Sequence, residues 1–156
     1  MRTLLLLTLC MPATASAKDL AGRVGFGFNN QFSSLSALSA RYVLPIHDVH
    51  FALEAQFGAS VIKAQDNGGF MGARAIWGLV REDNMLLHLG LGAGYWGEGS
   101  DSSIRIQPVV GAEFFLYGLE NLGFLVEWGV TLDFGEFRNQ AYTTSSLPSA
   151  GLHYYF

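Results

Sequence analysis

The chain has 156 residues, a formal net charge of -4 and 19 glycines; 50% of its residues are apolar and only 14% are charged. In soluble domains, about a quarter of all residues are usually charged. This composition argues against a disordered chain, a nucleic-acid-binding protein and an ordinary cytosolic protein. The length fits one domain. The single cysteine, Cys10, excludes a disulfide framework or a multi-cysteine metal site within the chain.

The first 17 residues have the pattern of a secretory signal peptide. Arg2 supplies a positive charge, an apolar run covers 4–11, and Ala15-Ser16-Ala17 is a small-x-small cleavage site. The apolar run is much shorter than the roughly 20 residues of a membrane-spanning helix. We predict cleavage after Ala17, which leaves residues 18–156 as one domain without cysteine. Because the loss of Arg2 makes this domain more acidic, we expect no nucleic-acid partner.

Eight segments of alternating polarity follow, and each is predicted to be a strand because strand side chains point to opposite faces with a period of two. In the first, Phe26 and Phe28 share one face while Arg23 and Gly25 share the other. In chain order the predicted strands cover 20–29, 37–44, 51–61, 71–79, 85–96, 104–116, 124–134 and 149–156. Eight strands make the smallest usual membrane barrel.

The connections between these segments alternate in length. Tight turns are predicted at 45–49, 81–84 and 118–122, and longer polar loops at 29–35, 62–69, 97–103 and 135–143. Short turns on one side and longer loops on the other match the periplasmic and extracellular ends of outer-membrane barrels. We therefore predict an all-β, eight-stranded antiparallel up-and-down transmembrane barrel with both termini in the periplasm. Pro108 and Pro148 fall within predicted strands, where they are expected to mark bulges.

Charge placement indicates which face meets lipid. Every charged residue of the predicted strands lies opposite the bulky apolar set, and an Arg or Lys facing lipid at mid-bilayer costs about 2–4 kcal/mol. A soluble barrel would show the same alternation, but its water-facing surface would normally be about 25–35% charged. As the lining of a narrow lumen, the many glycines leave space for long side chains. The predicted luminal polar network is Arg23, Arg41, Glu54, Arg74, His88, Arg105, Glu113, Glu127 and Asp133.

Hairpin geometry predicts how the luminal charges meet, to within about two residues of register. The predicted neighbours are Arg41 with Glu54, Arg74 one diagonal step from Glu54, Arg23 with Arg41, and His88 with Glu113. Four basic and four acidic groups can form the ion pairs that buried charges need. We predict a filled barrel with no open pore; the alternative is that these charges only line water.

The last eight residues carry a recognisable pattern. They are Ser149-Ala150-Gly151-Leu152-His153-Tyr154-Tyr155-Phe156, in which Gly151 precedes alternating apolar positions and an aromatic carboxyl-terminal residue. This ending resembles the C-terminal insertion signal of bacterial outer-membrane barrels, with Gly151, Leu152, Tyr154 and Phe156 as its elements. In size and pattern, the mature chain is similar to the eight-stranded family that includes the OmpA transmembrane domain, OmpX and Ail-like proteins. The resemblance implies contact with outer-membrane lipid and insertion by the barrel-assembly machinery.

A cluster of small residues is expected on the outer face of the third and fourth strands. It consists of Ala55, Ala59, Ala73 and Ala75. Small residues allow a second protein to approach closely within lipid, so this face is a candidate docking site for a membrane or envelope protein. The alternative is an ordinary lipid-facing belt.

No catalytic, metal or cofactor site is predicted. A lipid-modifying barrel needs a His, a Ser nucleophile and an acidic residue together near the outer leaflet, and none of the four His has such a Ser on that side. The turn residues His47, Asp48 and His50 lack the further ligands of a stable metal site. We predict a non-enzymatic structural or surface-interaction protein, including the role of a subunit in a cell-envelope assembly. A narrow channel for small solutes and an outer-leaflet lipid-modifying enzyme are the alternatives.

Overall fold

The computed structural model describes residues 19–30, 37–46, 49–60, 68–98, 101–135, 144–145 and 149–156. The predicted signal peptide, His47, Asp48 and Pro148 lie outside these residues. The described part of the chain is all β. Its strands are β1 (Val24–Asn29), β2 (Ala37–Val43), β3 (Phe51–Ser60), β4 (Gly68–Arg81), β5 (Met85–Glu98), β6 (Asp101–Phe115), β7 (Leu122–Gly135), β8 (Thr144–Ser145) and β9 (Ser149–Tyr155).

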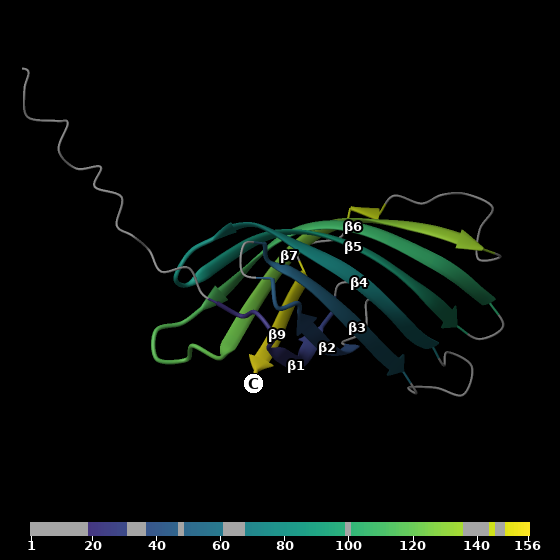
Figure 1. Ribbon diagram of the computed structural model, residues 1–156. Helices are drawn as coiled ribbons and strands as arrows, with labels where there is room; N and C mark the ends of the chain where they lie inside the picture. The colour runs from purple at the N-terminus through teal and green to yellow at the C-terminus, as the bar shows by residue number, and fades with distance from the viewer. Residues whose placement is uncertain are drawn as a thin grey trace, which may run out of the picture.

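Eight of these strands close into a barrel. From β1 to β7 each strand pairs antiparallel with the next, and β9 pairs with both β7 and β1 (Figure 1). The two-residue strand β8 pairs with Val130 and Thr131 of β7, on the edge that β9 also uses. The predicted eight-stranded antiparallel barrel is therefore confirmed.

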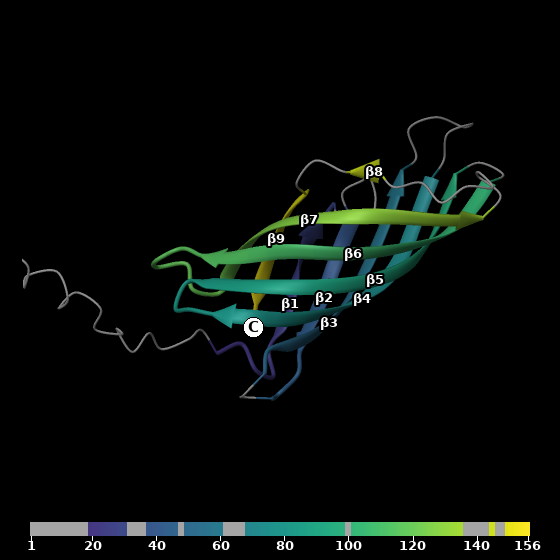
Figure 2. The ribbon, with the colours of Figure 1, turned by 90° about the horizontal axis from the view of Figure 1, so that it is seen from above.

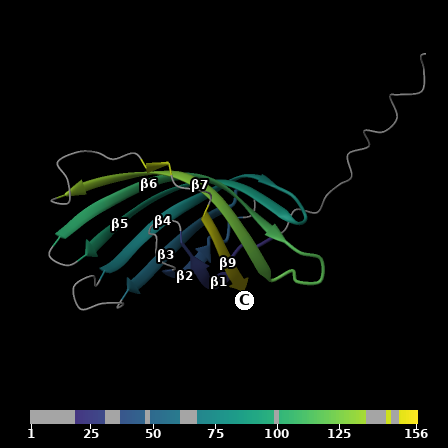
Figure 3. The ribbon, with the colours of Figure 1, turned by 180° about the vertical axis from the view of Figure 1, so that it is seen from behind.

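The strand registers set the width of the barrel. Following paired residues around the circuit returns to β1 displaced by about ten residues, which corresponds to strands tilted by about 40°. An eight-stranded barrel is just wide enough inside for side chains. Figures 2 and 3 show the long strands β3 to β7 as one curved wall, with the shorter β1, β2 and β9 completing the circuit.

The two ends of the barrel differ. Connections of a few residues join β2 to β3, β4 to β5 and β6 to β7 at one end, which we name the turn end; the opposite end is the loop end. The described ends of the chain both lie at the turn end, where Gly22 N donates to Val43 O and Tyr155 N donates to Asn121 O. Gly22 and Gly118 have φ angles of 77° and 82°, which favour glycine, and each forms part of a turn there.

Several strand boundaries differ from those predicted. β1 begins at Val24 rather than at residue 20, because Ala21 and Gly22 form a turn. β4 begins at Gly68, inside the predicted loop 62–69. β5 and β6 extend to Glu98 and Asp101, which pair with each other, so most of the predicted loop 97–103 is strand. Cross-strand hydrogen bonding continues here through polar and glycine residues that show no apolar alternation.

The predicted bulge at Pro108 is wrong. Pro108 pairs with Leu91 in an unbroken β5–β6 register, and the β6–β7 pairs on either side of it follow one register. Its ring points outward and its missing N–H interrupts the β6–β7 ladder without shifting it. The register instead shifts between Gly78 and Val80, near the turn end.

Side chains inside the barrel form layers. An apolar layer fills the turn end and consists of Leu20, Val43, Ala52, Ile76, Phe115 and Tyr155. A polar layer occupies the middle. Towards the loop end the buried Phe70 lies over Gly72, where an added Cβ would come within 2.5 Å of the Phe70 ring. The lumen is therefore filled by side chains through its middle, and the polar layer lies between apolar groups.

Candidate functional site

The polar layer starts from three residues on neighbouring strands. Arg41 on β2 pairs with Glu54 on β3, and Glu54 pairs with Arg74 on β4, so all three side chains enter the barrel at one level. Glu54 Oε2 accepts hydrogen bonds from Arg41 Nε at 2.7 Å and from Arg74 Nη2 at 3.1 Å. Gln56 Nε2 donates to the other carboxylate oxygen at 2.6 Å. Glu54 therefore lies between two guanidinium groups.

Both arginines also reach carboxylates on the opposite wall. Arg41 Nη1 donates to Glu113 Oε2 on β6 at 2.8 Å, and Arg74 Nη1 donates to Glu127 Oε2 on β7 at 2.6 Å. Since β2 and β6 are four strands apart in an eight-stranded ring, the Arg41–Glu113 pair crosses the lumen. The two ion pairs connect both walls of the barrel through its centre.

Tyr155 on β9 joins the cluster from a third direction. Its hydroxyl donates to Glu113 Oε1 at 2.8 Å and accepts from Arg41 Nη1 at 2.9 Å. The ring reaches this position across Gly25 of β1, where an added Cβ would lie 2.8 Å from the Tyr155 ring. A side chain at residue 25 would displace the ring, so Gly25 provides the space for this contact.

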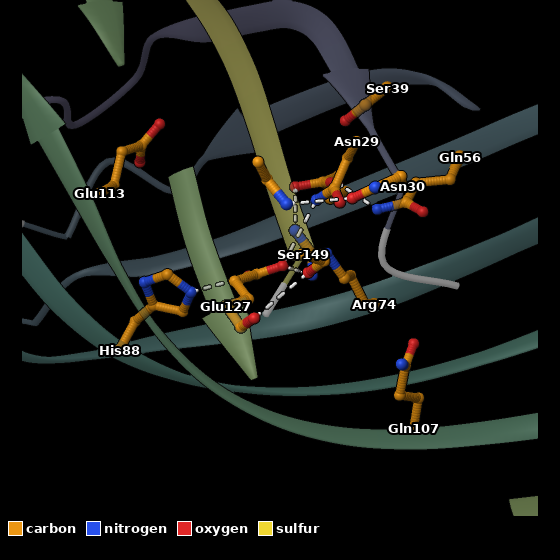
Figure 4. Close-up of polar contacts among 12 residues, drawn as sticks. Asn29, Asn30, Ser39, Gln56, Arg74, His88, Gln107, Glu113, Glu127 and Ser149 are labelled. Atoms are coloured by element: carbon orange, nitrogen blue, oxygen red, sulfur yellow. Dashed lines mark hydrogen bonds and ion pairs between the residues drawn. The ribbon is translucent and has the colours of Figure 1, made fainter. Parts of the chain in front are cut away.

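Two histidines complete the polar layer. His88 Nε2 on β5 lies 2.8 Å from Glu127 Oε1 (Figure 4). His153 Nε2 on β9 lies 2.7 Å from Ser39 Oγ, and its ring nitrogens lie 3.8 and 3.9 Å from two carboxylate oxygens. We name the central cluster by its members: Arg41, Glu54, Arg74, His88, Glu113, Glu127, His153 and Tyr155. All of them are buried.

The contacts inside the central cluster follow from the energetics of buried charge. Removing a charged group from water carries a penalty of several kcal/mol, which is offset only by well-placed partners of opposite charge and by hydrogen bonds. Glu127 illustrates the arrangement, because its carboxylate accepts from Arg74 and contacts His88 and Asn29 (Figure 4). Each carboxylate contacts at least one guanidinium group, so charges alternate through the cluster.

A further ion pair, outside the central cluster, lies closer to the loop end. Arg105 on β6 pairs directly with Asp133 on β7 and donates to it through Nε at 2.7 Å and Nη2 at 2.8 Å. The guanidinium carbon also lies 5.3 Å from the centre of the Trp96 ring. The two charged side chains are 16% and 27% exposed, unlike those of the central cluster. This pair is therefore partly solvated.

The predicted contacts of the first hairpins are partly correct. The structure brings Arg41 opposite Glu54 as predicted, and it places Arg74 directly opposite Glu54 rather than on a diagonal. The predicted neighbourhood of Arg23 and Arg41 is wrong, because Gly25 pairs with Arg41. Arg23 instead lies at the turn end and donates to the Asn121 side chain at 2.9 Å. The β1–β2 register differs from the prediction by two residues.

The predicted His88–Glu113 contact is also wrong. His88 pairs with Gly111, two residues away from Glu113 along β6. Gly111 has no side chain, and a Cβ there would lie 2.9 Å from His88 Nε2 and 2.5 Å from Glu127 Cγ. The imidazole therefore passes over β6 and meets the carboxylate of the next strand.

Sequence reasoning omitted several residues that contact the predicted network. Tyr155, His153 and Gln56 share the luminal face by alternation, but no charge marked them as members of a network. Phe70 lies just outside the predicted fourth strand. The alternation of inward and outward positions along each strand, together with glycines opposite these positions, could have identified Tyr155 and Phe70 as luminal side chains.

The residues of the proposed C-terminal signal divide between the two faces of β9. Tyr154 and Phe156 point outward, and their rings lie 4.9 Å apart between centres, with Phe156 also 6.2 Å from Phe26. Gly151 pairs with Asn29 of β1, and Leu152 pairs with Phe28. The aromatic end of the chain therefore lies on the outer wall beside β1.

The four alanines of the predicted partner face lie on the outer wall. Ala55 pairs with Ala73, Ala75 pairs with Leu53, and Ala59 pairs with Gly69. A groove of about 690 Å³ crosses this part of the wall and includes three of them, Ala55, Ala73 and Ala75. It continues onto neighbouring strands at two further outward alanines, Ala40 and Ala93. The predicted small-residue face is therefore part of a wider shallow groove between larger side chains.

The described residues contain no group of three or more His, Cys, Asp or Glu side chains placed to hold a metal. No helix in that part of the chain is long and apolar enough to cross a membrane. Ser39 and His153 form a buried Ser–His contact, but its oxygen and nitrogen atoms face the filled interior. Two of the turn residues considered for a metal site in the sequence, His47 and Asp48, lie outside the described residues.

The fold and interior define a closed eight-stranded antiparallel β-barrel with a buried ion-pair network. In comparisons with protein-family models, curated proteins and solved structures, the chain matches none of them.

Proposed function

We propose that the mature chain is an integral β-barrel of a bacterial outer membrane, with a filled lumen and a non-enzymatic structural or surface-interaction role. The observation that carries this proposal is the distribution of polarity across the barrel wall. Large apolar side chains are exposed on the outside, among them Leu91 at 59% and Trp128 at 61%, while charged groups are buried inside. This distribution is the reverse of that in a soluble barrel.

The physical argument rests on solvation. Monomeric soluble proteins rarely expose contiguous apolar patches larger than a few hundred Å². Here exposed apolar side chains continue around the wall, from Phe26 on β1 to Tyr154 on β9. Acyl chains solvate such a surface without cost, and a closed barrel satisfies its backbone hydrogen bonds without water. Lipid is therefore the solvent that fits this outer wall.

The first experiment compares solvents for folding. Residues 18–156, unfolded in urea, are diluted into detergent micelles and separately into plain buffer, and circular dichroism and size-exclusion chromatography follow the products. We expect a folded barrel in micelles and aggregate in buffer. A folded, monodisperse protein in plain buffer would contradict the membrane assignment. Fractionation of cell envelopes then tests the location directly.

The proposed interaction role is supported by the alanine groove. Four outward alanines on adjacent strands, Ala40, Ala55, Ala73 and Ala93, lie in direct register and allow close approach of another protein. Cysteines at Ala59 and Ala73 would be cross-linked in whole membranes, with a cysteine at the outward Val130 of β7 as control. Protein captured from the alanine positions but not from Val130 supports a docking face. Capture of lipid alone counts against it.

A narrow channel is the second candidate, because a continuous set of charged side chains occupies the interior. The contacts across the lumen favour a closed barrel, and we expect purified protein to give no reproducible conductance in planar bilayers. Conductance that changes on Glu113 or Arg74 replacement would favour the channel. The enzymatic alternative is tested separately: turnover of labelled outer-leaflet lipid by the purified protein would refute the non-enzymatic role.

A further inference from the structure

The apolar outer wall differs in height from strand to strand. Outward apolar side chains run from Leu122 to Phe134 on β7, and from Phe156 to Ala150 on β9. A strand tilted by about 40° rises by about 2.5 Å along the barrel axis per residue, so the two runs are about 30 Å and about 15 Å tall. Among the described residues, the wall at β9 is therefore half as tall as the wall at β7.

The tall part of the wall continues beyond β7. On β6 the outward apolar side chains run from Leu116 to Ile104, and on β5 from Met85 to Tyr95. These runs are about 30 Å and about 25 Å tall. We name β5, β6 and β7 the high wall (Figure 2), and β9 and β1 the low wall.

A polar residue marks the loop-end edge of the low wall. Asn30, directly after β1, is exposed, and its side-chain oxygen accepts a hydrogen bond from Ala150 N at 3.0 Å (Figure 4). The exposed aromatic side chains Phe26 and Phe28 precede it on β1. Transfer of an amide group from water to hydrocarbon is unfavourable. The surface suited to hydrocarbon therefore ends near Asn30.

The adjacent strand of the high wall stays apolar beyond this edge. Ala150 pairs with Val126 of β7, and the outward apolar side chains of β7 continue to Phe134, about 17 Å further along the barrel axis towards the loop end. The strand β8, which pairs with this part of β7, consists of Thr144 and Ser145. The wall therefore changes height between β7 and the low wall.

Aromatic side chains lie at both edges of the low wall. Phe28 lies next to the loop-end edge, and Tyr154 and Phe156 lie at the turn end. The register between β1 and β9 separates Phe28 from Phe156 by about 13 Å along the barrel axis. Aromatic residues flank the apolar band of membrane barrels at both interfaces, and this band is usually about 25 Å tall. The two aromatic edges are therefore unusually close together here.

We propose that the low wall is a membrane-thinning surface, next to which the acyl chains of membrane lipid are compressed in the leaflet at the loop end. An apolar segment shorter than the hydrocarbon thickness is accommodated by local thinning of the bilayer. The high wall reaches the usual height of about 25 Å, so the bilayer keeps its thickness there. The inference rests on the proposed membrane location and adds to it a surface that deforms the bilayer.

Depth measurements at matched heights test the proposal. Residues 18–156 contain no cysteine, so a single introduced cysteine can carry a fluorescent label. The registers and the tilt place Ala150 on the low wall level with Leu91 on the high wall, to within about 1 Å. They also place Tyr154 level with Leu87, four residues nearer the turn end on each strand.

The labelled proteins would be folded into phosphatidylcholine vesicles that carry nitroxides either near the headgroup or near the chain end. We expect the label of Leu91→Cys to lie about 10 Å deeper below the local membrane surface than that of Ala150→Cys, because the apolar surface of β5 continues to Tyr95. Labels at Tyr154→Cys and Leu87→Cys should lie at equal depth, since the thinning is confined to the loop end.

A second low-wall site keeps the measurement decisive if Ala150→Cys does not fold. Phe28→Cys on β1 lies about 2 Å below the height of Leu91, and its label should also be shallow. Both sites are outward, so neither label enters the lumen.

Three results would overturn the proposal. Equal depths at Ala150 and Leu91 would show that the bilayer meets both walls at the same height. A shallow label at Ala150 with a label at Tyr154 deeper than that at Leu87 would show a tilted barrel. Protection of the Ala150 and Tyr154 labels from lipid-borne nitroxides would show that a second copy covers the low wall. Quenching of all labels by aqueous iodide would instead contradict the membrane location itself.

Discussion

Replacing Arg41 by methionine should destabilise the barrel more than any substitution at the Arg105–Asp133 ion pair near the loop end. Methionine keeps much of the length of the side chain but removes the contacts to Glu54, Glu113 and Tyr155, so two buried carboxylates lose a guanidinium partner. Breaking a buried ion pair by removing one partner typically costs about 3–5 kcal/mol. We expect Arg41→Met to lower the free energy of unfolding by an amount in this range.

Arg105→Met is the matched control. Arg105 also makes two short hydrogen bonds to a carboxylate, but its side chain and that of Asp133 are 16% and 27% exposed. Partly solvated pairs contribute about 0–1 kcal/mol. Both variants would be unfolded in urea in the presence of micelles, with tryptophan fluorescence as the probe. If Arg41→Met lowers the free energy of unfolding no more than Arg105→Met does, burial of the central cluster does not strengthen its ion pairs.

Three further predictions follow from single residues. Gly111→Ala should lower the free energy of unfolding by about 1–3 kcal/mol in the same assay, because its methyl group would lie 2.5 Å from Glu127 Cγ; an unchanged stability would contradict this close approach. Phe70→Ala should cost about 3–5 kcal/mol by removing the ring that fills the lumen, and a loss below 1 kcal/mol would indicate that the ring is not packed. Burial, and next the charge of Arg41, lower the pKa of His50 from 6.5 to about 4, so its unfolded form binds the proton more readily. Stability should therefore fall, by up to about 3 kcal/mol, as pH drops from 6.5 to 4. The loss should be smaller in His50→Gln, and an equal loss would refute the assignment.

Alternating polarity predicts the fold well because each strand has one face in the interior and one outside. The same pattern identifies the luminal charges, since Arg41, Glu54 and Arg74 lie at the alternate positions of their strands that face away from the bulky apolar side chains. Register is harder to predict, because it depends on backbone geometry in the turns rather than on side-chain polarity. Arg23 and His88 were each misplaced for this reason, by two residues.

Contacts across the lumen cannot be predicted from sequence patterns alone. The Arg41–Glu113 pair depends on the combined registers of all the strands between β2 and β6, so small errors accumulate. The His88–Glu127 contact depends in addition on the missing side chain of Gly111. Tyr155 was overlooked because the C-terminal pattern draws attention to its outward neighbours, Tyr154 and Phe156. These contacts follow from three-dimensional closure of the barrel.

We propose that apolar side chains of the outer wall face lipid while the lumen does not. Two tryptophans allow a direct test: Trp128 is 61% exposed on the outer wall, and the half-buried Trp96 lies against the inward-facing Arg105. Single-tryptophan variants, with the other tryptophans changed to Phe, would be folded into vesicles of brominated phospholipid. We predict strong quenching of Trp128 fluorescence and much weaker quenching of Trp96. Equal quenching of both, or none at Trp128, would contradict the account.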